Sequence, residues 1–333
     1  MIANYIHFVF NKLRVNDAWR YKVPVLITVP YWVIYHYQTP FLPALFFIAL
    51  SFTTIIGIAA YAYTLNDWSD IEKDAAAGKP NAMAALSNSN RVILLAAFFA
   101  LAVTPWFFFP YTPLTIGLLI LELVLFALYS FPPFRLKEKP ILGILTDTSY
   151  AHVLPCLLAA LTFQAIAHKY YHQKIDFFFL SFGTFLCFWQ VSLGIRNILL
   201  HQQQDYYNDL QSGTVTFATS YPKIANGTLK LMLVAEVIGF ITLTDSLGKL
   251  MIGIGIAFAL HLATVYVNNK QLHFGTLRQN AYILLDDFYY KWLALPVLVY
   301  LCISDIRFVV LLALHILLFD NAIKDALKRI AKP

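Results

Sequence analysis

Charged residues are scarce in this sequence. Only 13% of its 333 residues are Asp, Glu, Lys or Arg, whereas 59% are hydrophobic. Soluble domains carry roughly 25% charged residues, so this chain lacks the polar side chains that a hydrated surface needs. A mean hydropathy of +0.64 agrees with that deficit. A water-soluble enzyme is therefore excluded, and we expect the lipid bilayer to be the solvent of the fold.

Cysteines are few, and a recognisable signal-peptide cleavage site is missing. The three cysteines, Cys156, Cys187 and Cys302, lie far apart in apolar runs. An odd number at such spacing argues against a disulfide framework or a metal knuckle, so we expect packed, reduced thiols. The N-terminal segment, residues 1–22, lacks the small residues of a cleavage site. We expect it to form an amphipathic helix on the membrane surface.

Long apolar runs dominate the rest of the chain. A helix that crosses a bilayer needs roughly 17–25 mostly apolar residues. The candidate runs are residues 23–37, 41–65, 92–109, 114–129, 141–167, 177–200, 229–244, 247–267, 288–303 and 308–319. They predict an all-α polytopic membrane bundle of nine or ten transmembrane helices, which forms a single domain over residues 1–333.

The placement of the basic residues predicts the orientation of this bundle. The chain has 24 Lys and Arg against 18 Asp and Glu, and most of the basic residues fall in alternate connections between the apolar runs. Such a bias marks the cytoplasmic side. We expect both termini and the even-numbered connections there, in a multi-pass protein of a prokaryotic inner (cytoplasmic) membrane. The net positive charge therefore implies no nucleic-acid partner.

Two of these cytoplasmic connections carry the same pattern of acids. The segment DIEKDAAAG starts at Asp70 and DYYNDLQSG starts at Asp205, so both match DxxxDxxxG. Each segment begins where a long apolar run ends. Two pseudo-repeated halves that present acids at the same membrane depth predict one shared site. The alternative is that these acids are solvated loop residues or helix caps.

The spacing of the acids suits a metal site. Within LNDWSDIEKD, the acids Asp67, Asp70 and Asp74 share one face if the helix continues through them. In the second segment the two acids are four residues apart. Mg²⁺ takes one or two carboxylates and completes its coordination with waters and substrate phosphate. The predicted magnesium ligands are Asn66, Asp67, Asp70, Asp74, Asp205 and Asp209.

Basic residues near the acids are candidate diphosphate ligands. Arg135 and Lys137 lie in the connection YSFPPFRLKEKP. Arg can bind phosphate through two parallel hydrogen bonds, and Lys can bind it as a single positive charge. Lys79, Arg196 and His201 are further candidates. The alternative for the loop residues is topological anchoring, and His201 is also typical of a helix end near lipid headgroups. Arg196 lies inside an apolar run, where a charge normally faces a cavity or a partner.

Three acids fall within the apolar runs. Glu122, Asp147 and Glu236 are costly there and mark a polar cavity or pairing between helices. Hydrogen bonding between helices is the structural alternative. As hypotheses, Glu122 or Asp147 lines an acceptor pocket, and Asp147 pairs with Arg196.

Three motifs resemble those of one protein family. NDWSDIEKD matches the NDxxDxxxD motif of the UbiA superfamily of intramembrane prenyltransferases, DYYND matches its second DxxxD motif, and YSFPPFRLK resembles its YSxPPxRLK loop. The resemblance implies an all-α bundle around a central cavity that binds a polyprenyl diphosphate through Mg²⁺. It also implies that five acids are catalytic: Asp67, Asp70, Asp74, Asp205 and Asp209.

The chain departs from the family pattern in two places. The family is described with nine spans, whereas the basic tail KDALKRIAKP favours a cytoplasmic C-terminus and a tenth span. His201 and three glutamines, residues 202–204, stand where the first motif has acids and Asn66. The second metal site is therefore poorer in charge.

Three functions follow from these features. The first is Mg²⁺-dependent transfer of a prenyl group from a polyprenyl diphosphate to an aromatic or other lipophilic acceptor in the membrane. The second is a terpene cyclase of the same superfamily, which uses the same metal site without an acceptor. The third is a secondary transporter that uses Glu122, Asp147 and Glu236, although transporters bind near the midplane and most acids here lie at one face. The acceptor, the prenyl chain length and the oligomeric state are not encoded in these motifs.

Overall fold

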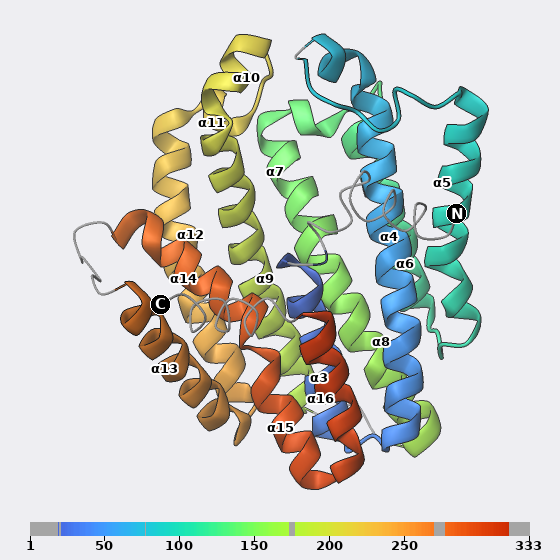
Figure 1. The fold of residues 1–333 in the computed structure, drawn as a ribbon, viewed down its shortest axis with the longest axis vertical. Coiled ribbons are helices and arrows are strands. Elements are labelled where there is room, and N and C mark those ends of the chain that lie inside the picture. The colour runs from blue at the N-terminus through green and yellow to red at the C-terminus, as the bar shows by residue number, and fades with distance from the viewer. Residues whose placement is uncertain (1–18, 20, 77, 173–176, 270–276, 320–333) are drawn as a thin grey trace, which may run out of the picture.

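The computed structural model describes residues 19, 21–76, 78–172, 177–269 and 277–319. These residues form helices and their connections, with no strand among them, as Figure 1 shows. The predicted all-α fold is confirmed. Most of the predicted N-terminal surface helix and the basic tail lie outside the described residues.

The first acid motif lies on α4 (Phe41–Ala76). At about 1.5 Å per residue, its 36 residues extend well past a hydrocarbon core of roughly 30 Å. The part from Phe41 to Ser69 is long and apolar enough to cross a membrane. The last turns therefore carry their acids beyond the membrane face.

The neighbouring helix α5 (Asn88–Val103) packs along α4. Gly57 makes this close approach possible, because a Cβ atom there would lie 2.3 Å from the backbone nitrogen of Ala102. No side chain fits at such a distance without moving one of the two helices.

A second helix pair repeats this arrangement. α9 (Phe177–Gln204) packs along α12 (Pro222–Ser246), and the short helices α10 (Tyr206–Ser212) and α11 (Phe217–Ser220) connect them. Gly239 permits the contact, since a Cβ atom there would lie 3.1 Å from the Trp189 backbone nitrogen. Each acid motif thus lies at the end of a long helix that packs against the next long helix, which supports the interpretation of two related halves.

The remaining helices complete the bundle. α7 runs through a π-helical turn, Ser149–Val153, into α8, so that Pro140–Tyr171 forms one long apolar span. Their bounds are α3 Val23–Tyr37, α6 Pro113–Ser130, α7 Pro140–Thr148, α8 Leu154–Tyr171, α13 Leu250–Asn269, α14 Leu277–Lys291, α15 Ala294–Ser304 and α16 Val309–Leu318.

The core of the bundle is built around α3. Nearly all of its side chains are buried, including the large Tyr31 and Trp32. It packs against α8 and α15. Its first turns, at Val23 and Leu26, face the internal cavity described below.

The outer surface has the character expected of a membrane protein. Leu42, Ile93 and Ile252 each expose about two thirds of their area (67%, 66% and 66%) on three different helices. Among the described residues, six helices are long and apolar enough to cross a membrane, and two shorter apolar helices accompany them. The protein is a multi-pass membrane protein, and the number of nine or ten spans stays a prediction.

Candidate active site

The first acid motif occupies the end of α4. The helix continues through the motif as expected, so the side chains of Asp70 and Asp74 lie one turn apart on one face. Asp67 is buried, whereas Asp70 and Asp74 are partly exposed. The carboxylates therefore become more exposed along the helix, from the bundle interior to its rim.

Asp70 contacts two basic side chains from the connection between α6 and α7. The Lys137 ammonium lies 2.7 Å from both Asp70 carboxylate oxygens, and the Arg135 Nη2 atom lies 2.7 Å from Oδ1. Lys137 also donates to the Asn66 side-chain oxygen at 3.1 Å. The structure thus brings the first acid motif and the two predicted phosphate ligands together.

The conformation of this connection directs its basic side chains toward α4. Arg135 has left-handed backbone angles, φ 37° and ψ 58°, which a non-glycine residue rarely adopts. Its guanidinium contacts Glu138 and donates to the Ser69 carbonyl at 3.2 Å, and Glu138 in turn contacts Lys73. These contacts from two sides hold Arg135 in its unusual conformation.

Two groups in this connection have shifted acidities. Burial lowers the pKa of the Lys137 ammonium, although the adjacent Asp70 carboxylate opposes that shift. Partial burial alone would raise the pKa of Glu138, but hydrogen bonds from Lys73 and Arg135 outweigh it and hold that pKa below its ordinary value. A network of ionic contacts therefore joins this connection to α4.

Asn81 is a site residue that the sequence did not reveal. Its side-chain nitrogen donates to Asp74 Oδ2 and to the Asp67 carbonyl, both at 2.7 Å. The chain reverses after α4, at Gly78 with its positive φ of 66°, and this reversal returns Asn81 to the helix. No motif marks a residue that reaches the site through such a turn.

The second acid motif lies at the junction of α9 and α10. Asp205 precedes α10, and the Asp209 backbone N–H donates to the Asp205 carbonyl at 2.8 Å. Burial and the negative charge of Asp205 raise the pKa of the Asp209 carboxyl, whereas a hydrogen bond from Thr216 and, to a lesser extent, the positive charge of Lys79 oppose this. His201 is exposed, with its Nδ1 atom 3.6 Å from Asp205 Oδ2.

The glutamine that replaces an acid in this half has a structural contact. Gln202 is buried, and its side-chain oxygen accepts a hydrogen bond from the Ala218 backbone N–H at 3.2 Å. It therefore fixes the start of α11 to the end of α9.

Both halves open onto one cavity. Figure 1 shows that α10 and the acid-bearing end of α4 lie at the same end of the molecule. Asn66 from the first half and His201 from the second line the same cavity, together with Lys137. The predicted convergence of both motifs is supported by this shared cavity.

The cavity has a volume of about 420 Å³ and extends into the bundle. Along α4 its wall runs from Asn66 at the opening to Ser51, a separation of about 22 Å at 1.5 Å per residue. Most of its wall is apolar: Ile55, Ile58, Ala59, Trp106, Phe109, Phe126, Pro155, Leu158, Ala159 and Phe163 are part of it. An elongated hydrocarbon fits this wall.

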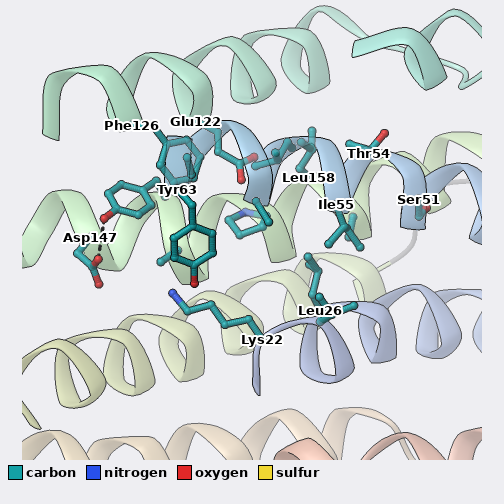
Figure 2. A pocket seen from close by; sticks show the side chains of 18 of the residues that line it. Lys22, Leu26, Ser51, Thr54, Ile55, Tyr63, Glu122, Phe126, Asp147 and Leu158 are labelled. Atoms are coloured by element: carbon teal, nitrogen blue, oxygen red, sulfur yellow. Dashed lines mark hydrogen bonds between the residues drawn. The ribbon is translucent and has the colours of Figure 1, made fainter. Parts of the chain in front are cut away.

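Polar residues that the sequence did not single out also line the cavity. Figure 2 shows Lys22, from the start of α3, and Tyr63, from α4, with their polar ends directed toward one another. The Tyr150 hydroxyl donates to Asp147 Oδ1 at 2.7 Å, and its ring lies 5.1 Å from that of Tyr129. No motif in the sequence indicates Lys22 or Tyr150, because helix packing alone brings them here.

Arg196, a candidate diphosphate ligand from the sequence, lies away from the cavity in an ion-pair cluster between helices. Its guanidinium is fully buried and pairs with Glu236 on α12 and with Asp286 on α14, 2.5 Å from Asp286 Oδ1. The hypothesis of a pair between Asp147 and Arg196 is therefore wrong: two acids from other helices occupy the guanidinium, and Asp147 accepts the Tyr150 hydroxyl instead. Glu236 is likewise a partner of Arg196, and neither residue is among those that line the cavity.

The oxygen donors suit a metal that arrives with its substrate. Within the described ranges, no three Asp, Glu, His or Cys side chains gather into a metal cage. Mg²⁺ needs no such cage, because phosphate and water fill most of its positions. None of the five motif acids lines the cavity itself, but Asp70 contacts Lys137 and Asp205 lies 3.6 Å from His201, and both of these partners do. This arrangement fits Mg²⁺ bound to a diphosphate.

Several solved structures have the same fold as this chain. A UbiA homolog from Archaeoglobus fulgidus bound to GPP and Mg²⁺ matches with a TM-score of 0.56 at 15% identity, over 88% of this chain and 99% of that chain. The same homolog bound to DMAPP and Mg²⁺ matches with a TM-score of 0.55 at 15% identity, over 87% and 98%.

A third similar structure is a digeranylgeranylglyceryl phosphate synthase. It matches with a TM-score of 0.52 at 14% identity, over 92% of this chain and 97% of that chain. At such identities the likeness establishes the fold. No curated protein sequence shows a significant match to this chain.

The family is established by the sequence itself. The model of the UbiA prenyltransferase family matches residues 25–285. This range includes both acid motifs, the connection with Arg135 and Lys137, and every residue that lines the cavity except Lys22 and Val23. This chain belongs to the UbiA prenyltransferase family.

Proposed function

We propose that this protein transfers a prenyl group from a polyprenyl diphosphate to an aromatic or other lipophilic acceptor within the membrane, with Mg²⁺ as its cofactor. One observation carries the proposal: the opening of a deep, mostly apolar cavity is lined by Asn66, Lys137 and His201, next to both acid motifs. A hydrocarbon chain with an anionic head suits this combination. The A. fulgidus homolog, whose structures contain GPP or DMAPP with Mg²⁺, supports it.

The residues at the opening bind and orient the diphosphate. Lys137 and Arg135, which contact Asp70 in this structure, are close enough to the acids to bind phosphate oxygens on one side of a metal-bound diphosphate. When bound, Mg²⁺ neutralises the diphosphate and makes it a better leaving group. The acids of the two motifs, Asp67, Asp70, Asp74, Asp205 and Asp209, would hold that metal, and Asn66 would supply a neutral oxygen.

The cavity wall protects the allylic carbon from water. The bond between this carbon and the diphosphate oxygen breaks, with the electron pair leaving on the diphosphate. The electron-rich acceptor then forms a bond to the carbon and loses a proton. The rings of Tyr129 and Tyr150 lie near the opening, where an aromatic face stabilises positive charge. Asp147, hydrogen-bonded to Tyr150, is placed to accept the proton.

The position of the acid and basic residues also supports an orientation of the bundle in the membrane. The acid motifs and the basic connection lie at one end of the bundle, where the positive-inside rule places the cytoplasm. The site loops therefore face the cytoplasm, in a prokaryotic inner membrane, and membrane lipids surround the single domain. Lys79, which is exposed just beyond the end of α4, would add positive charge at the same end of the bundle.

The decisive experiment measures diphosphate release. Purified protein in lipid nanodiscs is incubated with geranyl diphosphate, an aromatic phenol and Mg²⁺. We expect release with Mg²⁺ and none with EDTA, and we expect D70A and D205A each to abolish it. Glu72→Ala is the matched control, because Glu72 is exposed on the same helix. Full activity in D70A and D205A would refute the proposal.

Product analysis separates transfer from cyclisation. The same incubation without an acceptor yields no cyclic hydrocarbon or alcohol if the protein is a transferase. A cyclic product, identified by mass spectrometry, would favour the cyclase instead.

A further inference from the structure

Glu122 lies deep in the wall of the cavity. It is on α6, eight residues before Ser130, which also lines the cavity. Eight residues of α-helix correspond to about 12 Å along the axis. Figure 2 shows the carboxyl of Glu122 pointing from its helix into the cavity, beside Phe126. Only 1% of Glu122 is exposed.

The carboxyl group has no partner within the described part of the chain. Its Oε2 atom is buried and has no hydrogen bond there, and no described Lys, Arg or His forms an ion pair with it. Glu236, another buried acid within a span, differs in this respect because Arg196 pairs with it. The helix-pairing explanation of a buried acid therefore applies to Glu236 but not to Glu122.

A second polar group in the cavity wall also lacks a hydrogen-bond partner. Thr54, on α4, lines the cavity and is 7% exposed, and its hydroxyl oxygen is buried without a partner among the described residues. Other hydroxyls of the wall satisfy themselves locally: Ser51 donates to the Phe47 carbonyl at 2.8 Å and Thr162 to the Leu158 carbonyl at 2.6 Å. Three residues of the wall thus have a buried polar atom without a partner among the described residues: Glu122, Thr54 and Trp106, whose indole Nε1 is the third such atom.

Unpaired buried polar groups are costly, and a hydrocarbon does not relieve that cost. A carboxyl or hydroxyl that is buried without a hydrogen bond loses its hydrogen bonds to water and gains none in return. A prenyl chain offers neither a donor nor an acceptor. A hydroxyl offers both, so it is able to bond with a carboxyl and with a threonine hydroxyl.

We propose that Glu122 and Thr54 form a polar subsite that binds a hydroxyl group of the acceptor inside the membrane portion of the cavity. This inference rests on the proposed function, because it assigns the acceptor of that reaction to the inner part of the same cavity. It makes Glu122 a specificity-determining residue. An acceptor that lacks the hydroxyl leaves both polar groups unpaired and binds more weakly.

The test compares two probes of the same ring system, one with a free hydroxyl and the other with that hydroxyl methylated, so that only the first is able to donate a hydrogen bond. The fluorescence of 2-naphthol and of its methyl ether, 2-methoxynaphthalene, reports their equilibrium binding to the protein in nanodiscs, with empty nanodiscs as the background. We expect wild-type protein to bind 2-naphthol about tenfold more tightly than the ether. Glu122→Met, which keeps the side-chain length, and Thr54→Val, which keeps the shape, should each reduce this ratio, and Glu122→Met should bring it to about one.

The controls distinguish a lost subsite from a lost fold. Leu121→Ala, on the lipid-facing side of α6, should retain the wild-type ratio. Binding of the ether should be unchanged in Glu122→Met and Thr54→Val, because its contacts are apolar. An undiminished preference for 2-naphthol in both subsite variants, equal binding of the two probes by wild-type protein, or no saturable binding of 2-naphthol would each overturn the proposal.

The assay measures equilibrium binding and requires no turnover. If diphosphate release is absent while the hydroxyl preference is present, the proposed function fails and the subsite remains. If diphosphate release depends on Mg²⁺ and both acid motifs while the preference is absent, the subsite fails and the proposed function remains.

Discussion

The Lys137 ammonium contacts both carboxylate oxygens of Asp70, at 2.7 Å each. The two residues come from different parts of the chain, one at the end of α4 and the other in the connection between α6 and α7. The contact joins the residue types that a metal diphosphate needs, a hard oxygen ligand and a phosphate-binding cation.

Replacing Lys137 should weaken diphosphate binding. A hydrogen bond to a charged group contributes about 1.5–3 kcal/mol, so Lys137→Met should raise the Kd for geranyl diphosphate with Mg²⁺ roughly 10- to 100-fold. Isothermal titration calorimetry measures this. Lys139→Met, at an exposed lysine of the same connection, should stay near the wild-type value. Equal effects of the two variants would show that the connection provides only a diffuse positive charge.

Glu138 should stabilise the fold only where its carboxyl is ionised. Its contacts with Lys73 and Arg135 hold its pKa below the ordinary value, against the effect of partial burial. A depressed pKa in the folded state gives stability that is present above the unfolded-state pKa of about 4.3 and lost as the pH falls through the folded-state pKa. Glu138→Gln should lower the Tm at pH 7 but not at pH 3. A Tm difference of the same size at both pH values would contradict the ionic role.

Gly57 should tolerate no side chain. A Cβ atom would meet the Ala102 backbone nitrogen at 2.3 Å, so Gly57→Ala must separate α4 from α5 and should destabilise the protein by about 1–3 kcal/mol. Gly117→Ala is the matched control, because a Cβ there has no neighbour within 4 Å, and it should be neutral or slightly stabilising. Thermal unfolding in detergent compares the two. The packing argument is wrong if both variants have the wild-type Tm.

Arg196 should stabilise the folded protein. It is fully buried between Glu236 and Asp286, and removal of one partner from a buried ion pair typically costs about 3–5 kcal/mol. Arg196→Met should therefore lower the Tm strongly, and Arg196→Met with Glu236→Met should recover part of the loss, because the unpaired buried carboxylate is removed. Absence of recovery in the double variant would show that Glu236 is not the residue left uncompensated.

The sequence was sufficient for the parts of the site that lie on continuous motifs. The acids of α4 share a face because α-helical spacing dictates it, and long apolar runs required helices. The partner of Arg196 was not predictable in this way, since it depends on how α9, α12 and α14 pack. The sequence places Asp147 within a span, which makes it a candidate partner of Arg196. The structure shows that the partners are Glu236 and Asp286, which lie on α12 and α14.

Residues that reach the site through turns or packing were also missed. Asn81 contacts Asp74 only because the chain reverses after Ala76, and Lys22 reaches the cavity because α3 lies at the centre of the bundle. Single-sequence patterns describe periodicity along one helix and carry no information about the distance between helices. The depth of Glu122 was predictable from its place in a span, but its lack of a partner required the structure.

The central claim is that both acid motifs serve one diphosphate site, and a binding stoichiometry tests it most directly. Calorimetric titration of geranyl diphosphate into the purified protein should give one site per chain with Mg²⁺ and no binding with EDTA. Asp70→Asn and Asp209→Asn should each remove the binding almost entirely, and the double variant should add little. Binding that persists in EDTA, or single variants that leave the affinity unchanged, would contradict the account.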